Sequence, residues 1–230
     1  MSKNLLPDDL RNSAVEPFPC VERILPEEIE RRSFEIITQE LAAMGKMLQP
    51  GTEEIVKRCI HTSADFDYAD NLYFSPGAVK AGLRAIRAGA CIVTDTQMAK
   101  AGINKKALAK FGGEVFCFMS DEDVAVRARE LGTTRACVSM DKAADLDGEL
   151  IFAIGNAPTA LIRLRELIDA GRIRPKLIIG VPVGFVNVVA SKELIMETDI
   201  PCIVAKGRKG GSNIAACICN ALIKNISSFR

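Results

Sequence analysis

The segment Leu150-Ile151-Phe152-Ala153-Ile154-Gly155-Asn156-Ala157-Pro158-Thr159 joins an unbroken apolar run to a small polar turn and a proline. Unbroken apolar runs of this length are typical of strands that are covered on both faces of a parallel sheet. Pro158 suits the first turn of a helix, where its missing N–H and its fixed φ are tolerated. The segment therefore predicts a strand, a turn and a helix in succession.

Similar apolar runs lie at residues 91–94, 115–119, 177–181 and 202–205, and a segment with helical character follows each. Alternating strands and helices predict an α/β protein with a three-layer α/β/α, Rossmann-like architecture and right-handed crossovers. We expect a mainly parallel five-stranded sheet made from these runs. An additional helix is expected at residues 133–144.

Helices are also predicted ahead of the first strand. Pro26 opens one that runs to about Leu48, because prolines and the two glutamates that follow favour a helix N-terminus. A shorter helix starts after Thr52 and carries His61 at its end. Residues 1–24 are polar and rich in proline, which indicates an N-terminal arm, so residues 25–230 are expected to form a single α/β domain.

The composition excludes several classes of function. The chain has 230 residues and a formal net charge of +1, so no general electrostatic attraction favours nucleic acid or an anionic membrane. The sequence has neither the long apolar run of a membrane span nor the apolar core of a secretory signal, and we expect a cytoplasmic protein. Its eight cysteines form no Cys-x-x-Cys pair. We therefore expect structural thiols and no protein-bound metal.

His61 is the only histidine, so chemistry that moves a proton near neutral pH would most naturally use it. Its place near a helix C-terminus favours a cation, which suits a proton donor. The alternative is a histidine that only packs or caps the helix. The nearby Asp65, Asp67 and Asp70 could bind a hard cation, but solvated loop residues or partners of His61 are the more common roles.

Small and polar residues follow the predicted strands on the edge where α/β proteins bind ligands. These loops are Thr94-Asp95-Thr96-Gln97-Met98, Gly155-Asn156-Ala157-Pro158-Thr159, Pro182-Val183-Gly184-Phe185 and Lys206-Gly207-Arg208-Lys209-Gly210-Gly211-Ser212. The last loop combines glycines, three cations and a following helix, which indicates an anion site. The alternative is an ordinary glycine-rich turn. Neither the P-loop order nor Gly-x-Gly-x-x-Gly is present, and no Gly-x-Ser-x-Gly elbow accompanies His61.

Taken in order, five segments of the chain resemble the precorrin-8X methylmutase family of cobalamin biosynthesis, in its metal-free or cobalt-dependent form. They are Arg58-x-Ile60-His61-Thr62-x-Ala64-Asp65-x-Asp67, Thr94-Asp95-x-x-Met98-x-x-x-Gly102-Ile103, Gly155-Asn156-Ala157-Pro158-Thr159-Ala160-Leu161, Gly180-x-Pro182-Val183-Gly184-Phe185-Val186 and Gly207-Arg208-Lys209-Gly210-Gly211-Ser212. The resemblance implies an isomerase, an intramolecular transferase that moves a methyl group from C-11 to C-12 of (cobalt-)precorrin-8. The product would be (cobalt-)hydrogenobyrinate or cobyrinate.

The resemblance also implies roles for individual residues. His61 would be the catalytic proton donor. Substrate contacts would come from Ser33, Arg58, Thr94, Asp95, Met98, Arg135, Asn156, Ala157, Gly184, Lys192, Gly207, Arg208, Gly210, Gly211 and Ser212. No cofactor is implied, since any cobalt is carried by the tetrapyrrole substrate, and the protein would be a homodimer. One departure is visible, because Ala190 precedes Ser191 and Lys192 where the family pattern has a glutamate.

Two other functions remain open at this level. The chain could be a corrinoid carrier that binds the pigment without catalysis. It could also be an anion- or phosphate-binding α/β enzyme that uses the glycine-rich loop.

Overall fold

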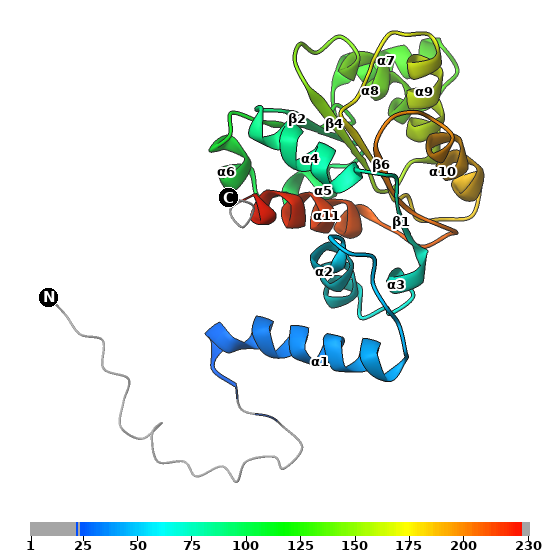
Figure 1. Ribbon diagram of the computed structural model, residues 1–230. Helices are drawn as coiled ribbons and strands as arrows, with labels where there is room; N and C mark the ends of the chain where they lie inside the picture. Colours follow the sequence, from blue (N-terminus) through cyan, green and yellow to red (C-terminus); the bar gives the residue numbers. More distant parts are fainter. Residues whose placement is uncertain (1–21, 23, 227–230) are drawn as a thin grey trace, which may run out of the picture.

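Residue 22 and residues 24–226 are described by a computed structural model of the protein, shown in Figure 1. The arm predicted at residues 1–24 therefore falls almost wholly outside the described residues. Within the described part of the chain, no helix is both long enough and apolar enough to cross a membrane.

A mostly parallel sheet forms the centre of the molecule, as predicted. Its strands are β1 (Leu72–Phe74), β2 (Cys91–Thr94), β3 (Val115–Phe116), β4 (Leu150–Ile154), β5 (Leu177–Gly180) and β6 (Cys202–Ala205). Among the described residues they form one sheet of six strands in the order β1-β6-β5-β4-β2-β3. The five predicted strands are all present and parallel, and three of them have the predicted bounds.

The prediction missed strand β1, which pairs antiparallel with β6 and places Leu72 opposite Ala205. Three residues are too few to show a periodic pattern, and the short helix α3 (Tyr68–Asn71) directly precedes them. Strand β3 is also shorter than predicted, because only Val115 and Phe116 pair with β2. One edge of the sheet is therefore an antiparallel strand that the sequence pattern did not predict.

Alternate residues of the central strands point to opposite faces of the sheet and fill two cores. Ile151 and Ile179 belong to one core, and Phe152 and Ile178 belong to the other. Helices α2 (Glu53–Ser63), α4 (Ala78–Arg87), α6 (Lys105–Ala109) and α11 (Ser212–Asn225) add side chains to the first core; α8 (Arg135–Ala143), α9 (Pro158–Asp169) and α10 (Val188–Met196) add theirs to the second. Two helical layers around one sheet confirm the α/β/α class (Figure 1).

Two further helices, α5 (Gln97–Gly102) and α7 (Glu122–Glu130), complete the layers, with α7 packed on α8. Helix α1 (Ile29–Ala43), preceded by one 3₁₀ turn at Pro26–Glu28, lies outside α2 and buries Ile37 and Leu41 (Figure 1). The prediction that this helix continues to Leu48 was wrong. Gly45 takes a φ of 66°, and the Lys46 N–H bonds back to the Leu41 carbonyl, which closes the helix in a glycine C-cap.

Phe152 tests the central strand, because its side chain has 0% exposure in the core beneath α8 and α9. We expect Phe152→Ala to lower the free energy of unfolding by about 3–5 kcal/mol, since it leaves a cavity. Phe185→Ala is the matched control, because Phe185 is 82% exposed; its effect should stay within about 0.5 kcal/mol. Urea unfolding followed by circular dichroism measures both, and equal effects would contradict this core.

Candidate functional site

The loop after β6 crosses directly over the end of β5. The Gly211 N–H donates to the Val181 carbonyl at 2.9 Å, and a Cβ on Gly210 would lie 2.0 Å from the same oxygen. Gly210 and Gly211 also have φ values of 154° and 137°, which disfavour any side chain. The glycines predicted as an anion loop are therefore required by a close backbone contact, and Gly211 is the N-cap of α11.

Asp95, at the end of β2, fixes the loop that follows β4. Its carboxylate accepts hydrogen bonds from the N–H groups of Gly155, Asn156 and Ala157 at 2.9, 2.8 and 2.6 Å. Burial raises the pKa of the Asp95 carboxyl, while these donors act in the opposite direction. The Asp95 carboxylate thus holds the backbone turn at residues 155–157 in place.

Thr94 is enclosed in the same way, with its hydroxyl donating to the carbonyls of Thr96 and Phe116. Thr94 and Asp95 both have 0% exposure, so neither side chain faces the solvent, and their predicted contact with a substrate stays a prediction. Both residues support the loops from beneath. A hydrogen bond of 2.7 Å between the Thr96 and Ser212 hydroxyls then joins the β2 loop to the start of α11.

Lys192 of α10 holds the glycine-rich loop from inside the protein. Its side chain is 1% exposed, and Nζ donates to the carbonyls of Gly207 and Lys209 at 2.8 and 2.9 Å. Burial lowers the pKa of the Lys192 ammonium to about 8. The predicted substrate contact of Lys192 also stays a prediction, and in this structure the side chain positions the loop.

The three cations of this loop have different partners. Lys209 Nζ pairs with both Asp65 and Asp67 at 2.6 Å, which raises the pKa of Lys209 and, through the hydrogen bond to Lys209, lowers the pKa of Asp65. Lys206 Nζ lies 5.1 Å from the centre of the Tyr73 ring. The Arg208 guanidinium lies 5.5 Å from the centre of the exposed Phe185 ring. Lys209 is therefore neutralised by carboxylates, whereas Lys206 and Arg208 have no carboxylate partner within the described residues.

Asp65 and Asp67 are thus partners of Lys209, rather than solvated residues or partners of His61. Asp70, the third carboxylate of the segment, pairs with Lys46. Among the described residues, no cluster of three or more histidine, cysteine or acidic side chains could hold a metal ion.

His61 occupies the last turn of α2, as predicted, and its ring is exposed. The Phe34 ring of α1 lies 5.6 Å from it, centre to centre. The loop that follows connects it to the strand ends, because Asp65 is only four residues further on and pairs with Lys209. The chain geometry limits the His61 and Asp65 Cα atoms to about 14 Å apart. The lone imidazole and the glycine-rich loop therefore border the same region.

Arg58 and Ser33, two predicted substrate contacts, lie near His61 but are engaged within the protein. Arg58 donates to Glu54 and Glu30, each at 2.7 Å, and lies over the Phe34 ring. The Ser33 hydroxyl donates to the Ile29 carbonyl at 2.9 Å. A cavity of about 330 Å³ opens beside them, lined by Glu27, Glu30, Arg31, Phe34, Glu54, Arg58 and Lys224.

The remaining predicted contacts lie on the accessible edge of the strand-end loops: Met98, Asn156, Ala157, Gly184, Gly207 and Ser212. The Gly184 N–H donates to the Arg208 carbonyl at 3.2 Å, which joins the β5 and β6 loops. Arg135 is exposed at the first position of α8. Its neighbour Thr134 hydrogen-bonds Thr159 at the start of α9, so Arg135 lies beside the β4 loop.

An exposed apolar group completes this edge; Met98 was predicted as a substrate contact, and its three apolar neighbours were not. Met98 is 70%, Val183 47%, Phe185 82% and Val186 79% exposed. Large apolar side chains in short loops between glycine and polar residues were the available signal, since such side chains are usually buried. Phe34 beside His61 was also missed, because nothing in the sequence links α1 to the end of α2.

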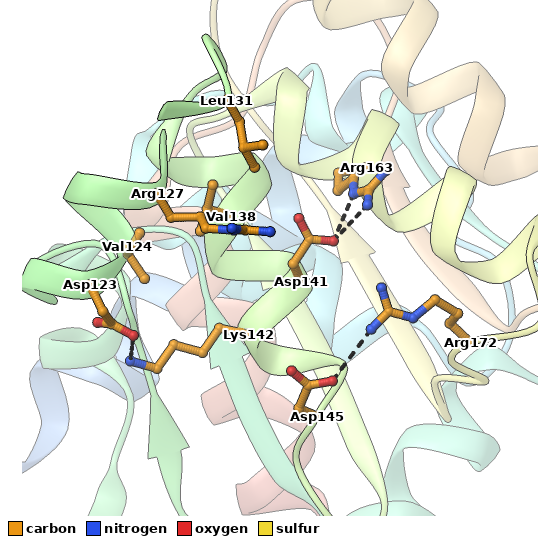
Figure 2. A pocket seen from close by; sticks show the side chains of 10 residues that line it. All are labelled: Asp123, Val124, Arg127, Leu131, Val138, Asp141, Lys142, Asp145, Arg163 and Arg172. Atoms are coloured by element: carbon orange, nitrogen blue, oxygen red, sulfur yellow. Dashed lines mark hydrogen bonds and ion pairs between the residues drawn. The ribbon is translucent and has the colours of Figure 1, made fainter. Parts of the chain in front are cut away.

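A cavity of about 460 Å³ lies elsewhere, between α7, α8 and α9 (Figure 2). Most of the charged side chains around it pair with one another: Lys142 with Asp123, Arg163 with Asp141, and Arg172 with Asp145. This cavity contains none of the predicted site residues, so we do not assign the activity to it.

Lys192 makes the support of the glycine-rich loop testable. Lys192→Met keeps the length of the side chain but removes the ammonium and its two hydrogen bonds, and we expect it to lower the free energy of unfolding by about 1–3 kcal/mol near pH 7. The ordinary lysine pKa of about 10.4 applies in the unfolded chain, so the folded protein binds fewer protons between pH 8 and that value. The wild type should therefore gain stability over the variant as the pH rises through this window.

Denaturant unfolding of both proteins between pH 7 and 10.5 measures this difference, and contributions of other titrating groups cancel in the comparison. Lys206→Met is the matched control, because Lys206 is exposed in the same loop. A stability difference that does not change with pH would show that Lys192 is not a buried ammonium.

Comparisons with known proteins identify relatives over most of the chain. The family model for precorrin-8X methylmutase matches residues 28–225. The chain is 47% identical over 203 residues to a cobalt-precorrin-8 methylmutase of Priestia megaterium, covering 86% of this chain and 88% of that protein. It is 44% identical to the cobalt-precorrin-8 methylmutase of Salmonella typhimurium, with coverages of 87% and 96%.

A solved structure of a precorrin-8X methylmutase from Thermus thermophilus superimposes with a TM-score of 0.78 at 42% identity, covering 87% of this chain and 98% of that chain. The family model spans every strand of the sheet, the helix that carries His61 and the glycine-rich loop. The chain therefore belongs to the precorrin-8X methylmutase family.

Proposed function

We propose that this chain moves a methyl group from C-11 to C-12 of (cobalt-)precorrin-8, with His61 as the proton donor. The reaction is an isomerisation in cobalamin biosynthesis, the role that its relatives support. The observation that carries the proposal is the position of His61. The ring is exposed at the end of α2, and the loop after it is paired with the glycine-rich loop through Lys209.

The reaction requires from the protein a proton donor and a surface that holds the macrocycle in a reactive geometry. A methyl shift within one molecule transfers no electrons to a partner, so we propose that it needs no protein-bound metal or cofactor; any cobalt belongs to the substrate. General acid catalysis typically contributes a factor of 10²–10⁴ in rate, about 3–5 kcal/mol of barrier. One exposed imidazole can supply that, and holding the macrocycle in a reactive geometry supplies the remainder.

The accessible edge of the strand-end loops suits a large, carboxylate-fringed pigment. Apolar surface for the macrocycle is offered by the exposed side chains of Met98, Val183, Phe185 and Val186. Arg208 is exposed and free of carboxylate partners within the described chain, so it is placed to meet an acetate or propionate group. Backbone N–H groups of the neighbouring loops can bind further carboxylates.

We also propose that the protein works as a homodimer in the cytoplasm. Helix α1 lies on the outside of the molecule and exposes Ile29 by 52% and Ile36 by 37%. These residues are seven positions apart and lie on one side of the helix. A second copy of the chain could cover this apolar side of α1.

His61→Ala should reduce turnover by about 10²–10⁴ and leave the Kd for the tetrapyrrole nearly unchanged, because the ring acts on the transition state. The visible spectrum follows conversion of metal-free and cobalt-containing substrate in separate assays. His61→Asn is the informative companion, because it keeps an N–H donor but cannot transfer a proton at neutral pH. Wild-type turnover by His61→Ala would remove His61 from the mechanism.

The same assays separate the other two functions. A corrinoid carrier would bind the product tightly, and the purified wild type would move no methyl group. A phosphate-binding enzyme would be stabilised against heat by phosphate and not by corrinoids.

Arg208→Ala should weaken substrate binding about tenfold, because one charge-assisted hydrogen bond contributes roughly 1.4 kcal/mol or more. Turnover at saturating substrate should change less than affinity. Arg129→Ala is the control, since Arg129 is exposed on α7, away from the strand-end loops. Fluorescence or absorbance titration gives both Kd values, and an unchanged Kd for Arg208→Ala would argue against this contact.

A further inference from the structure

Two cysteines face each other where α2 packs against α11. Cys59 lies in α2 with 0% exposure, and Cys217 is half-buried in α11. Cys59 is part of the core between the two helices and Cys217 packs against that core, while the Thr62 hydroxyl donates to the Cys217 sulfur at 3.2 Å. Cys59 and Thr62 are three residues apart in α2, so both reach Cys217 from one face of that helix.

From this arrangement we propose that Cys59 and Cys217 form an oxidisable thiol pair, and that hydrogen peroxide converts it into a disulfide between α2 and α11. The proposal does not depend on the identity of the substrate. It assigns a modification site to side chains that the isomerisation does not use.

The surroundings of Cys217 favour its thiolate. The hydrogen bond from Cys59 is the largest cause, and it lowers the pKa of Cys217 to about 7; the Thr62 hydroxyl and the Arg58 charge act in the same direction. Burial and the Glu54 carboxylate oppose them. Cys59, as the donor in a buried position, has a raised pKa and remains a thiol. One sulfur is therefore the nucleophile and the other is the resolving thiol.

The reaction balances with peroxide as the only oxidant. The Cys217 thiolate attacks one peroxide oxygen, the O–O bond breaks, and a sulfenic acid and hydroxide form. The Cys59 sulfur then attacks the Cys217 sulfur as its proton is lost, the S–O bond breaks, and water leaves. The Cys59 proton leaves in that water, and the hydroxide of the first step takes up the proton that Cys217 lost on ionising. Each cysteine sulfur is oxidised by one electron, and one peroxide is reduced to two molecules of water.

The disulfide would act on the segment that carries His61. Cys59 precedes His61 by two residues, and Thr62 loses its thiolate partner when the sulfur is oxidised. Sulfur atoms in a disulfide lie about 2.05 Å apart, closer than hydrogen-bonded thiols. The disulfide would therefore tie the last turn of α2, which carries the imidazole, to α11.

The test uses the full chain, reduced and then treated with a small excess of hydrogen peroxide at pH 7. After blocking with an alkylating agent, digestion without reductant and mass spectrometry should show a peptide linking residues 59 and 217. The number of free thiols should fall by two per chain and return with dithiothreitol. Cys219→Ser removes the second cysteine of the 217 peptide and should give the same cross-link, because Cys219 is fully buried.

Variants at residue 59 separate the two parts of the proposal. Cys59→Ser keeps a hydroxyl donor, so Cys217 should still react with iodoacetamide about fivefold faster than an ordinary thiol at pH 7. Peroxide should then stop at a Cys217 sulfenic acid that dimedone traps. Cys59→Ala removes the donor, and the rate should fall toward that of an ordinary thiol.

Cys137 provides the matched control, because it is also half-buried and also accepts from a threonine hydroxyl, that of Thr134 at 3.3 Å. No disulfide partner is assigned to it, and Cys137→Ser should leave the cross-link unchanged. The proposal is overturned if the wild type gives no 59–217 peptide under peroxide while thiols are lost elsewhere. It is also overturned if Cys217 alkylates no faster than Cys137.

Discussion

The backbone contact between Gly211 and Val181 sets the geometry on which the rest of the site depends. The loop after β6 must pass within hydrogen-bonding distance of the end of β5, and Gly210 leaves no space for a side chain there. This crossing determines where α11 begins. Helix α2 packs on α11, and His61 is carried in the last turn of α2. The position of His61, the only histidine of the chain, therefore depends through helix packing on the backbone geometry of two glycines.

The layers of this fold could be predicted because the strands and helices have clear patterns of apolar residues. Unbroken apolar runs such as residues 150–154 identify strands that are buried on both faces, and the helices between them follow from caps and periodicity. Strand β1 could not be found, since Leu72, Tyr73 and Phe74 form a strand only because β6 offers them an edge. The C-terminus of α1 was misplaced because a glycine C-cap at Gly45 outweighed the continuing apolar spacing.

For the candidate site, the sequence predicts which residues follow the strands but not which of their side chains are exposed. Residues at the strand ends do lie close together. The charged groups of Asp95 and Lys192, however, form hydrogen bonds with backbone groups inside the protein. Sequence motifs identify residues that a family keeps, and they do not separate a group that contacts a ligand from one that holds a loop. The charges of a loop, read from its sequence, likewise do not show which of them are available to a ligand. Lys209 is neutralised by carboxylates that lie 142 and 144 positions away in the sequence.

Backbone strain is also concentrated around this edge. Within the described part of the chain, the non-glycine residues with positive φ are Ala64 and Asn187. Ala64 ends the helix that carries His61, and Asn187 is the N-cap of α10 just after Phe185 and Val186. A left-handed alanine costs roughly 1 kcal/mol or more, and such strain persists where the surrounding contacts over-determine it. Here the ion pairs of Lys209 and the packing of α2 on α11 supply those contacts. The left-handed conformation of Ala64 therefore lowers the stability of the fold slightly. In return, it lets the loop after His61 turn back toward the strand ends.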